Sequence, residues 1–167
     1  MNFELRKLTV NDDTDIYHML QEIPKDENGL INPMNGKTFE EYKQWLIRSD
    51  ELSKATELQD NWKVPTTTYW LYVNGNPVGM GKIRHFLTDK LMEEGGNAGY
   101  AIRHGERNKG YGTILLKMLT EEALEIKIDR LLLTIRNNNI GSIKVALKNN
   151  GVIEKVNAER HYIWIDC

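Results

Sequence analysis

The chain has 167 residues, 40% of them hydrophobic and 28% charged, a composition typical of a globular protein with enough chain for one domain and its core. Its net charge of −2 argues against nucleic-acid binding through bulk electrostatics, and its one cysteine, Cys167, excludes a disulfide within the chain. The N-terminus lacks the apolar core of a signal peptide, and no apolar run approaches the roughly 18 residues of a membrane-spanning helix. We therefore expect one cytoplasmic domain over 1–167 with no membrane partner.

The first half of the chain alternates strand and helix patterns. Alternating apolar residues predict a strand over 2–8, and 11–23 begins with capping residues and continues with apolar residues at helical spacing. The glycine, proline and asparagine content of 27–36 is typical of a loop. A Thr-x-x-Glu capping box then begins a helix predicted over 38–52.

The second half continues this alternation. Residues 66–87 predict a β-hairpin around a turn at 74–77. The elements expected after it are a strand at 97–102, a helix at 109–127, a strand at 130–135, a short helix within 137–151 and a closing strand pair at 152–156 and 161–165. Strands interleaved with helices indicate a mixed α/β domain with a central sheet.

The stretch YAIRHGERNKGYGTILLKML, residues 100–119, places Arg107, Lys109, Gly110 and Gly112 where a helix is predicted to begin. Its glycines complete neither a P-loop nor a dinucleotide-binding fingerprint. The first turn of a helix nevertheless has open backbone N–H groups at a positive dipole end, and glycines permit close approach of a ligand. Cations are otherwise unfavourable at this end of a helix. The pattern therefore predicts an anion-binding turn, and the alternative is a plain surface turn.

Four stretches carry a resemblance to a known family. GYAIRHGERNKGYGTILLKML resembles the acetyl-coenzyme A motif of the GNAT superfamily of N-acetyltransferases, Gln/Arg-x-x-Gly-x-Gly/Ala. VGMGKIRHFLTDKLMEEGGNAGYAIR resembles a bacterial subgroup with an Ile-Arg-His strand end, a Gly-Gly pair and a Gly-Tyr strand. NNNIGSIKVALKNNGVIE and RHYIWI are similar to that subgroup's Asn-x-x-Ser helix and terminal aromatic strand. The resemblance covers about residues 65–167.

This resemblance implies the GNAT-like acyl-CoA N-acyltransferase fold, an α/β fold with a central mixed sheet of about seven strands and about four helices. The strands at 97–102 and 130–135 would splay apart around the pantetheine arm of acetyl-CoA, the implied co-substrate. The backbone N–H groups of Ile102 and Arg103 would face the pantetheine amide and the thioester, and the amides of 108–113 would hold the pyrophosphate. The residues implied to bind acetyl-CoA are Ile102, Arg103, Arg107, Asn108, Lys109, Gly110, Tyr111, Gly112, Thr113, Asn139 and Ser142. Asn139 is equally well read as a helix N-cap.

The implied reaction is acetyl transfer to a primary amine, which is mostly protonated at pH 7 and must lose a proton. His85 and Glu94 are the candidate bases, with Glu93 beside Glu94, and the alternatives are a structural histidine and a solvent-exposed turn. Many GNAT enzymes place a proton-donating tyrosine on the last helix. The matching place here is about Ala146, so the general acid stays unassigned.

Three functions remain open at this stage. The first is an N-acetyltransferase acting on an amine of a small molecule or a protein, and the second is a non-catalytic CoA-binding module such as a sensor. The third, a nucleic-acid binder using Arg103, His104, Arg107 and Lys109, conflicts with the acidic charge balance, and we expect no nucleic-acid partner. The resemblance allows a homodimer. The four histidines have no ligand-like spacing, so we expect no metal.

Overall fold

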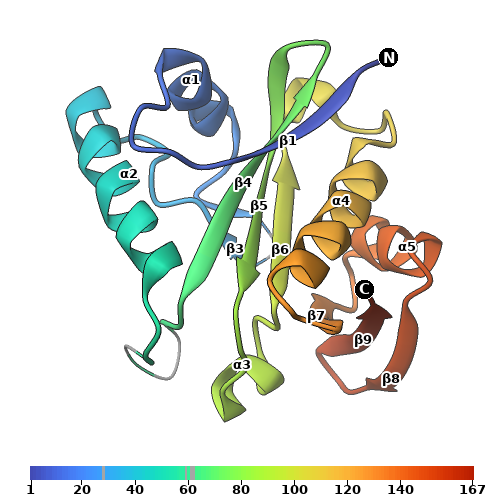
Figure 1. Ribbon diagram of the computed structural model, residues 1–167. Helices are drawn as coiled ribbons and strands as arrows, with labels where there is room; N and C mark the ends of the chain where they lie inside the picture. Colours follow the sequence, from blue (N-terminus) through green and yellow to red (C-terminus); the bar gives the residue numbers. More distant parts are fainter. Residues whose placement is uncertain (28, 59, 61–62) are drawn as a thin grey trace.

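The computed structural model describes residues 1–27, 29–58, 60 and 63–167, and it has helices on both sides of a twisted sheet (Figure 1). The strands are β1 (Phe3–Lys7), β2 (Asp26–Glu27), β3 (Leu30–Ile31), β4 (Thr66–Val73), β5 (Asn76–Arg84), β6 (Ala98–Ile102), β7 (Arg130–Arg136), β8 (Val152–Val156) and β9 (Arg160–Asp166). The helices are α1 (Thr14–Glu22), α2 (Phe39–Lys54), α3 (Asp89–Glu93), α4 (Tyr111–Glu125), α5 (Ile140–Lys148) and the 3-10 turn η1 (His104–Glu106).

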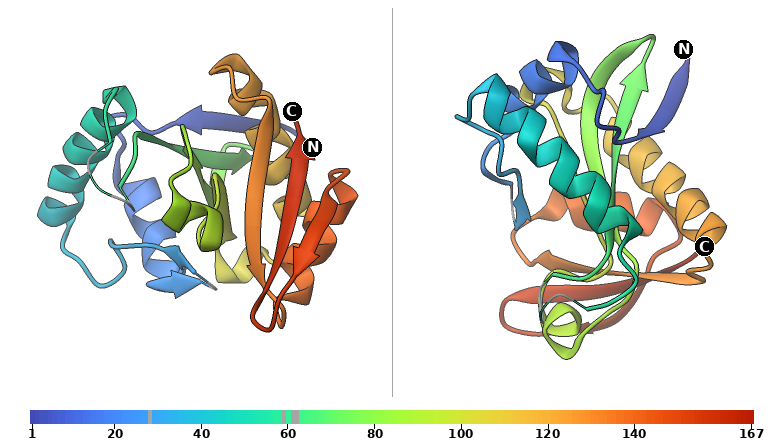
Figure 2. Two further views of the ribbon diagram at one scale, coloured as in Figure 1. Left: turned by 90° about the horizontal axis from the view of Figure 1, so that it is seen from below. Right: turned by 60° about the vertical axis from the view of Figure 1, so that its left-hand side comes forward.

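Seven of these strands form two antiparallel sheets, in the orders β1-β4-β5-β6 and β7-β9-β8, and β2 pairs with β3. Figure 2 shows the second sheet beside β6, with its strands running across those of the first. The predicted α/β fold class is confirmed. In three details the described residues differ from the expectation: they contain five α-helices, the seven strands do not form one continuous ladder, and all paired strands are antiparallel, whereas a mixed sheet was expected.

The break between the two sheets has a local cause at the start of β6. Asn97 N donates to Leu132 O (2.8 Å), and Leu132 N donates to the Asn97 side chain (2.9 Å). Gly96, at φ 61°, lies so close to β7 that a Cβ would stand 2.2 Å from Leu132 O. Within the described residues no ladder joins β6 to β7 beyond this point. The two strands are therefore tied at one end and free to diverge.

Hydrophobic side chains bury both faces of the first sheet. On one face, α1 and α2 cover a cluster that includes Met19, Trp45 and Trp70. On the other face, α4 covers a cluster that includes Leu115 and Leu119 and continues to β7 and β9. β5 and β6 therefore lie between two packed hydrophobic layers.

Most predicted elements form within one or two residues of their predicted ends. The capping box of α2 is present, with Glu41 N donating to Thr38 Oγ1 (3.2 Å) and Thr38 N to Glu41 Oε2 (2.8 Å). The loop expected at 27–36 is wrong in part, because Asp26–Glu27 pairs with Leu30–Ile31, while Asn28 lies outside the described residues. The short helix α3 was not predicted. In the part of the chain that the structure describes, no helix has the length and apolar character needed to cross a membrane.

Candidate active site

A cavity of about 90 Å³ occupies the gap between β6 and β7. We call it the gap pocket. Its walls come from the β2–β3 hairpin, the end of β5, the turn after α3, both diverging strands, the start of α5 and the start of β9. The residues lining it are Glu27, Gly29, Leu30, Arg84, Glu94, Gly95, Ala98, Gly99, Tyr100, Leu133, Thr134, Ile135, Asn139, Ser142 and Arg160. The predicted residues Glu94, Asn139 and Ser142 are thereby brought together.

The turn before α4 presents a run of open backbone N–H groups. The first helical bond of α4 is donated by Ile114 N to Gly110 O (3.3 Å), and within the described residues no acceptor pairs with the N–H groups of 108–113. Asn108 and Gly110 have positive φ angles of 62° and 82°, an alternation that turns successive N–H groups toward one side. A Cβ on Gly110 would meet nothing within 4 Å. We call residues 108–113 the cradle, which has the donors and the open space that a phosphate group requires.

Acidic residues neutralise the cations around the cradle, a feature that the local sequence did not indicate. Arg103 pairs with Glu22, and Lys109 Nζ lies 2.8 Å from Glu106 Oε2. Arg107 pairs with Glu27, and its Nη2 lies 3.0 Å from Glu27 Oε2. That Arg107 nitrogen is buried and lacks aligned hydrogen-bond geometry, so the contact is an ion pair only. Glu22 and Glu27 come from distant segments of the chain, so the pattern at 107–112 alone does not predict these two ion pairs.

The inner edge of β6 faces the gap. Arg103 N donates to Val78 O (2.9 Å), and pairing alternates along antiparallel strands, so Tyr100 and Ile102 direct their backbone groups away from β5. The N–H group of Ile102 thus faces the gap, and its carbonyl accepts from Arg107 Nε (3.1 Å). The Arg103 amide, expected to face the thioester, is already bonded within the sheet, and that expectation is wrong. The Arg103 side chain instead contacts Glu22 and Pro77 O.

At the start of α5, Asn139 serves as the N-cap, with Ser142 N donating to its Oδ1 (3.3 Å) and its Nδ2 donating to Ser142 Oγ (3.0 Å). Both residues also line the gap pocket, so both interpretations of Asn139 hold geometrically. Tyr100 reaches the same wall, and its buried hydroxyl makes no hydrogen bond that meets standard geometry in the described residues. Burial raises the pKa of Tyr100, with the nearby Ser142 hydroxyl opposing that shift. The Tyr111 side chain, by contrast, packs in the core against Phe3.

Glu94 and His85, the two candidate bases, occupy different places. Glu94 follows α3 and lines the gap pocket, where Arg160 Nη2 donates to its Oε1 (2.6 Å). His85 is outside the gap-pocket lining, and its Nε2 bonds the Thr67 hydroxyl (2.7 Å). Burial, followed by the charge of Lys7, lowers the pKa of His85. Thr67 shares its face of β4 with Tyr69 and Leu71, which pack in the cluster under α4, so His85 lies on the α4 face of the sheet.

Glu27, Arg84 and Arg160 are site residues that the sequence analysis missed. Glu27 and Arg160 carry no local signal, because the chain brings them to the pocket from its two ends. Arg84 does carry one: it stands two residues after Lys82 in an otherwise apolar strand, so both cations share one face. Among the described residues no group of three or more potential ligands is arranged to hold a metal ion.

Splayed strands followed by a phosphate-sized cradle define an acyltransferase fold of the kind that the sequence resembles. Residues 32–152, more than half of the chain, match the model of the acetyltransferase (GNAT) family. The chain belongs to this family and is an acetyltransferase. The predicted family and enzyme class are thus confirmed, while a search of curated proteins finds no match.

Solved structures share the fold at low sequence identity. The acetyltransferase of the GNAT family from Streptococcus pneumoniae is 18% identical, with a TM-score of 0.64 and 98% of each chain covered. The Campylobacter jejuni N-acetyltransferase PseH in complex with acetyl coenzyme A is 14% identical, with a TM-score of 0.58 and 99% of each chain covered. YncA from Salmonella typhimurium, with its cofactor acetyl-CoA, is 12% identical, with a TM-score of 0.66 over 99% of this chain and 94% of that one.

Proposed function

We propose that this protein transfers the acetyl group of acetyl-CoA to a primary amine of a small molecule or protein. The observation that carries the proposal is the run of open N–H groups at 108–113 beside a pocket between diverging strands. Two further features fit acetyl-CoA: the open space at Gly110, and the buried Arg107 nitrogen without an aligned acceptor. PseH and YncA, named above, were crystallised with acetyl-CoA.

Each part of the site would have a distinct task. The cradle would hold the pyrophosphate through its amides, and the β6 edge at Tyr100 and Ile102 would contact the pantetheine arm. Asn139 and Ser142 would flank that arm from α5. Bound acetyl-CoA supplies the thioester whose carbonyl carbon the amine attacks, which yields an amide and a CoA thiol. Side chains around the gap pocket would then accept the proton that leaves the amine and donate a proton to the sulfur.

We assign the first proton to Glu94. Its carboxylate lines the gap pocket and attracts an ammonium group, and the buried Arg160 guanidinium fixes its position. His85 lies on the α4 face and lacks access to this pocket. For the second proton, Tyr100 is the candidate donor in place of the tyrosine that is absent near Ala146. Burial keeps its phenol protonated at neutral pH, and its hydroxyl has no firm partner among the described residues.

A turnover assay with matched variants tests these assignments. Acetyl-CoA is supplied with a panel of amines, and release of the CoA thiol and formation of the amide are both measured. Glu94→Gln keeps a polar contact to Arg160 but cannot accept a proton, so kcat/KM at pH 7 should fall by about 100-fold or more. The remaining rate should follow the fraction of free amine, so it should rise steadily with pH toward the pKa of the amine. His85→Gln, which preserves a polar contact to Thr67, should retain both the rate and the pH profile.

The alternative function, a non-catalytic CoA-binding module, rests on the absent tyrosine. It predicts saturable acetyl-CoA binding without acetylation of any amine in the panel. Amide formation by the wild type and its loss in Glu94→Gln would reject that alternative. An unaltered pH profile in Glu94→Gln would instead reject Glu94 as the base.

A further inference from the structure

Lys82 and Arg84 are two cations on one face of β5 that no carboxylate neutralises among the described residues. Lys82 Nζ donates to Ile31 O (3.0 Å), and Arg84 Nη1 donates to the carbonyls of Gly95 and Gly96 (both 3.2 Å). Every cation around the cradle, by contrast, has an acidic partner. The strand thus keeps two adjacent positive charges beside the gap pocket, held only by neutral acceptors.

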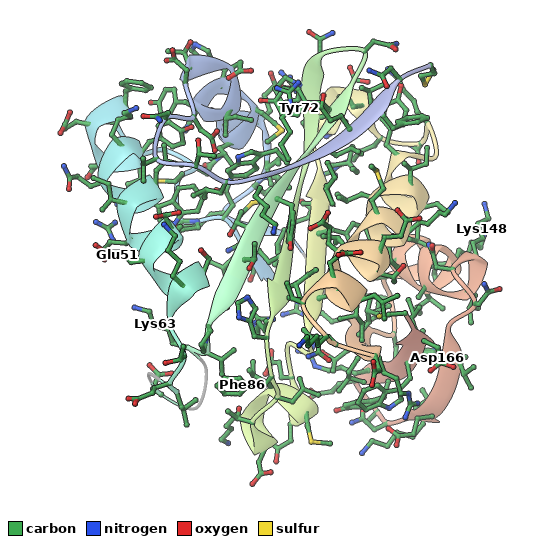
Figure 3. The ribbon with its side chains drawn as sticks, in the orientation of Figure 1. Glu51, Lys63, Tyr72, Phe86, Lys148 and Asp166 are labelled. Atoms are coloured by element: carbon green, nitrogen blue, oxygen red, sulfur yellow. The ribbon has the colours of Figure 1, made fainter. Side chains whose placement is uncertain are left out.

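A second cavity, of about 270 Å³, opens against these two side chains. We call it the anion pocket. It lies between the end of α2, the start of β4 and the residues Asp60 and Lys63, the latter labelled in Figure 3 below the lower end of α2. Its charged lining consists of Lys63, Lys82, Arg84 and one carboxylate, Asp60, whose Oδ1 accepts from Lys63 N (2.6 Å). Arg84 lines both the anion pocket and the gap pocket, so the two cavities adjoin at its side chain.

The lining of the anion pocket suits a negatively charged group. Two hydroxyl-bearing residues, Ser49 and Thr68, accompany the cations and offer neutral donors, while the Thr66 hydroxyl donates to Val64 O (2.8 Å). Desolvation, reinforced by the charge of Arg84, lowers the pKa of Lys82 to about 8. Placing a desolvated ammonium beside a guanidinium opposes folding, and a buried anion would remove that penalty. A structural role alone would be served better by an apolar side chain at this position.

We propose that the acceptor amine carries a carboxylate or phosphate group, which binds in the anion pocket between Lys63, Lys82 and Arg84. The amine end of the same molecule then extends past Arg84 into the gap pocket, where Glu94 and Glu27 supply negative charge. The acceptor is therefore a compact molecule with an amine at one end and an anion at the other. This inference rests on the proposed acetyl transfer and narrows its acceptor class.

Pairs of amines that differ in the anionic group test the inference. Ethanolamine is compared with O-phosphoethanolamine, and propylamine with 3-aminopropanoate, so that the phosphate and carboxylate arms are separate. For at least one pair, the wild type should show a kcat/KM at least about tenfold higher for the anionic member. Lys82→Met should raise the KM of that substrate by about 10- to 100-fold, as expected for loss of a charged hydrogen bond, with little change in kcat. The KM of the neutral partner should stay constant.

Lys148→Met is the matched control, because it removes the same charge from an exposed position on α5, which Figure 3 shows on the opposite side of the molecule from Lys63. This variant should behave as the wild type with every amine. If neutral amines are acetylated as well as their anionic partners, or if Lys82→Met affects both members equally, the inference is overturned while acetyl transfer stands.

If no amine is acetylated, the proposed function fails, and a binding measurement still decides about the pocket. Inorganic phosphate is titrated calorimetrically into protein saturated with CoA, so that the cradle is occupied. Saturable binding that Lys82→Met weakens at least about tenfold, and Lys148→Met leaves intact, supports the anion pocket. Absence of phosphate binding to the wild type under these conditions overturns it.

Discussion

Replacing Lys82 by methionine should stabilise the unliganded protein at pH 7, even though the residue lies in a sheet near the centre of the molecule. Its pKa falls from an ordinary 10.5 in the unfolded chain to about 8 in the folded protein, mainly through burial. At about 1.4 kcal/mol for each pH unit, this difference corresponds to roughly 3 kcal/mol against folding. The lost hydrogen bond to Ile31 O offsets about 1 kcal/mol, so the expected net gain is about 2 kcal/mol.

The sign of the pH dependence follows from proton binding. Between about pH 8 and 10.5 the unfolded chain holds a proton on Lys82 that the folded protein has released, so the free energy of unfolding of the wild type rises with pH in this window. The advantage of Lys82→Met is therefore complete below pH 8 and shrinks above it. Urea unfolding at pH 7, 8, 9 and 10 measures both effects, with Lys148→Met as control, expected within about 0.5 kcal/mol of the wild type. A destabilised Lys82→Met variant, or a pH-independent difference, would refute the reasoning.

Two further predictions concern the cradle and the junction of the sheets. Glu27→Gln removes the acidic partner of Arg107 (3.0 Å), so calorimetry should show acetyl-CoA binding about 2- to 5-fold more tightly, and weaker binding would mean that Glu27 positions Arg107 for the ligand. Asn97→Ala leaves Leu132 N–H without its partner at the tie between β6 and β7, so urea unfolding should show a loss of about 2–3 kcal/mol. A loss below about 0.5 kcal/mol would show that Asn97 does not hold the strands together.

The sequence predicted those features that depend on local pattern. The capping box at Thr38, the hairpin turn at Asn74 and the glycines of the cradle each specify backbone geometry within a few residues, and each is present. Where a prediction depended on tertiary contacts, it failed or stayed incomplete. The Arg103 amide donates to Val78 rather than facing the gap, and the His85 side chain lies on the α4 face of the sheet. Strand register determines both orientations.

Ion pairs between distant segments also could not be predicted from the sequence. Glu22 and Glu27 neutralise cations more than 75 residues away in the chain, and no local spacing encodes such a contact. The strand positions of Lys82 and Arg84 did carry a readable signal, since two cations with one residue between them share a face of β5. The pocket on this face forms because α2 and the residues Asp60 and Lys63 pack beside it, and no local pattern predicts that packing.

Calorimetric titration of acetyl-CoA into the wild type, Gly110→Glu and Gly36→Glu tests the central claim, that the open amides at 108–113 bind this co-substrate. Gly110 and Gly36 have nearly equal φ angles of 82° and 79°, and a Cβ meets nothing within 4 Å at either, so the two variants share backbone strain and charge. Only Gly110→Glu places a carboxylate in the cradle. Micromolar binding by the wild type and Gly36→Glu, with loss in Gly110→Glu, is the predicted result. Equal binding by all three folded proteins, or no binding by the wild type, would contradict the claim.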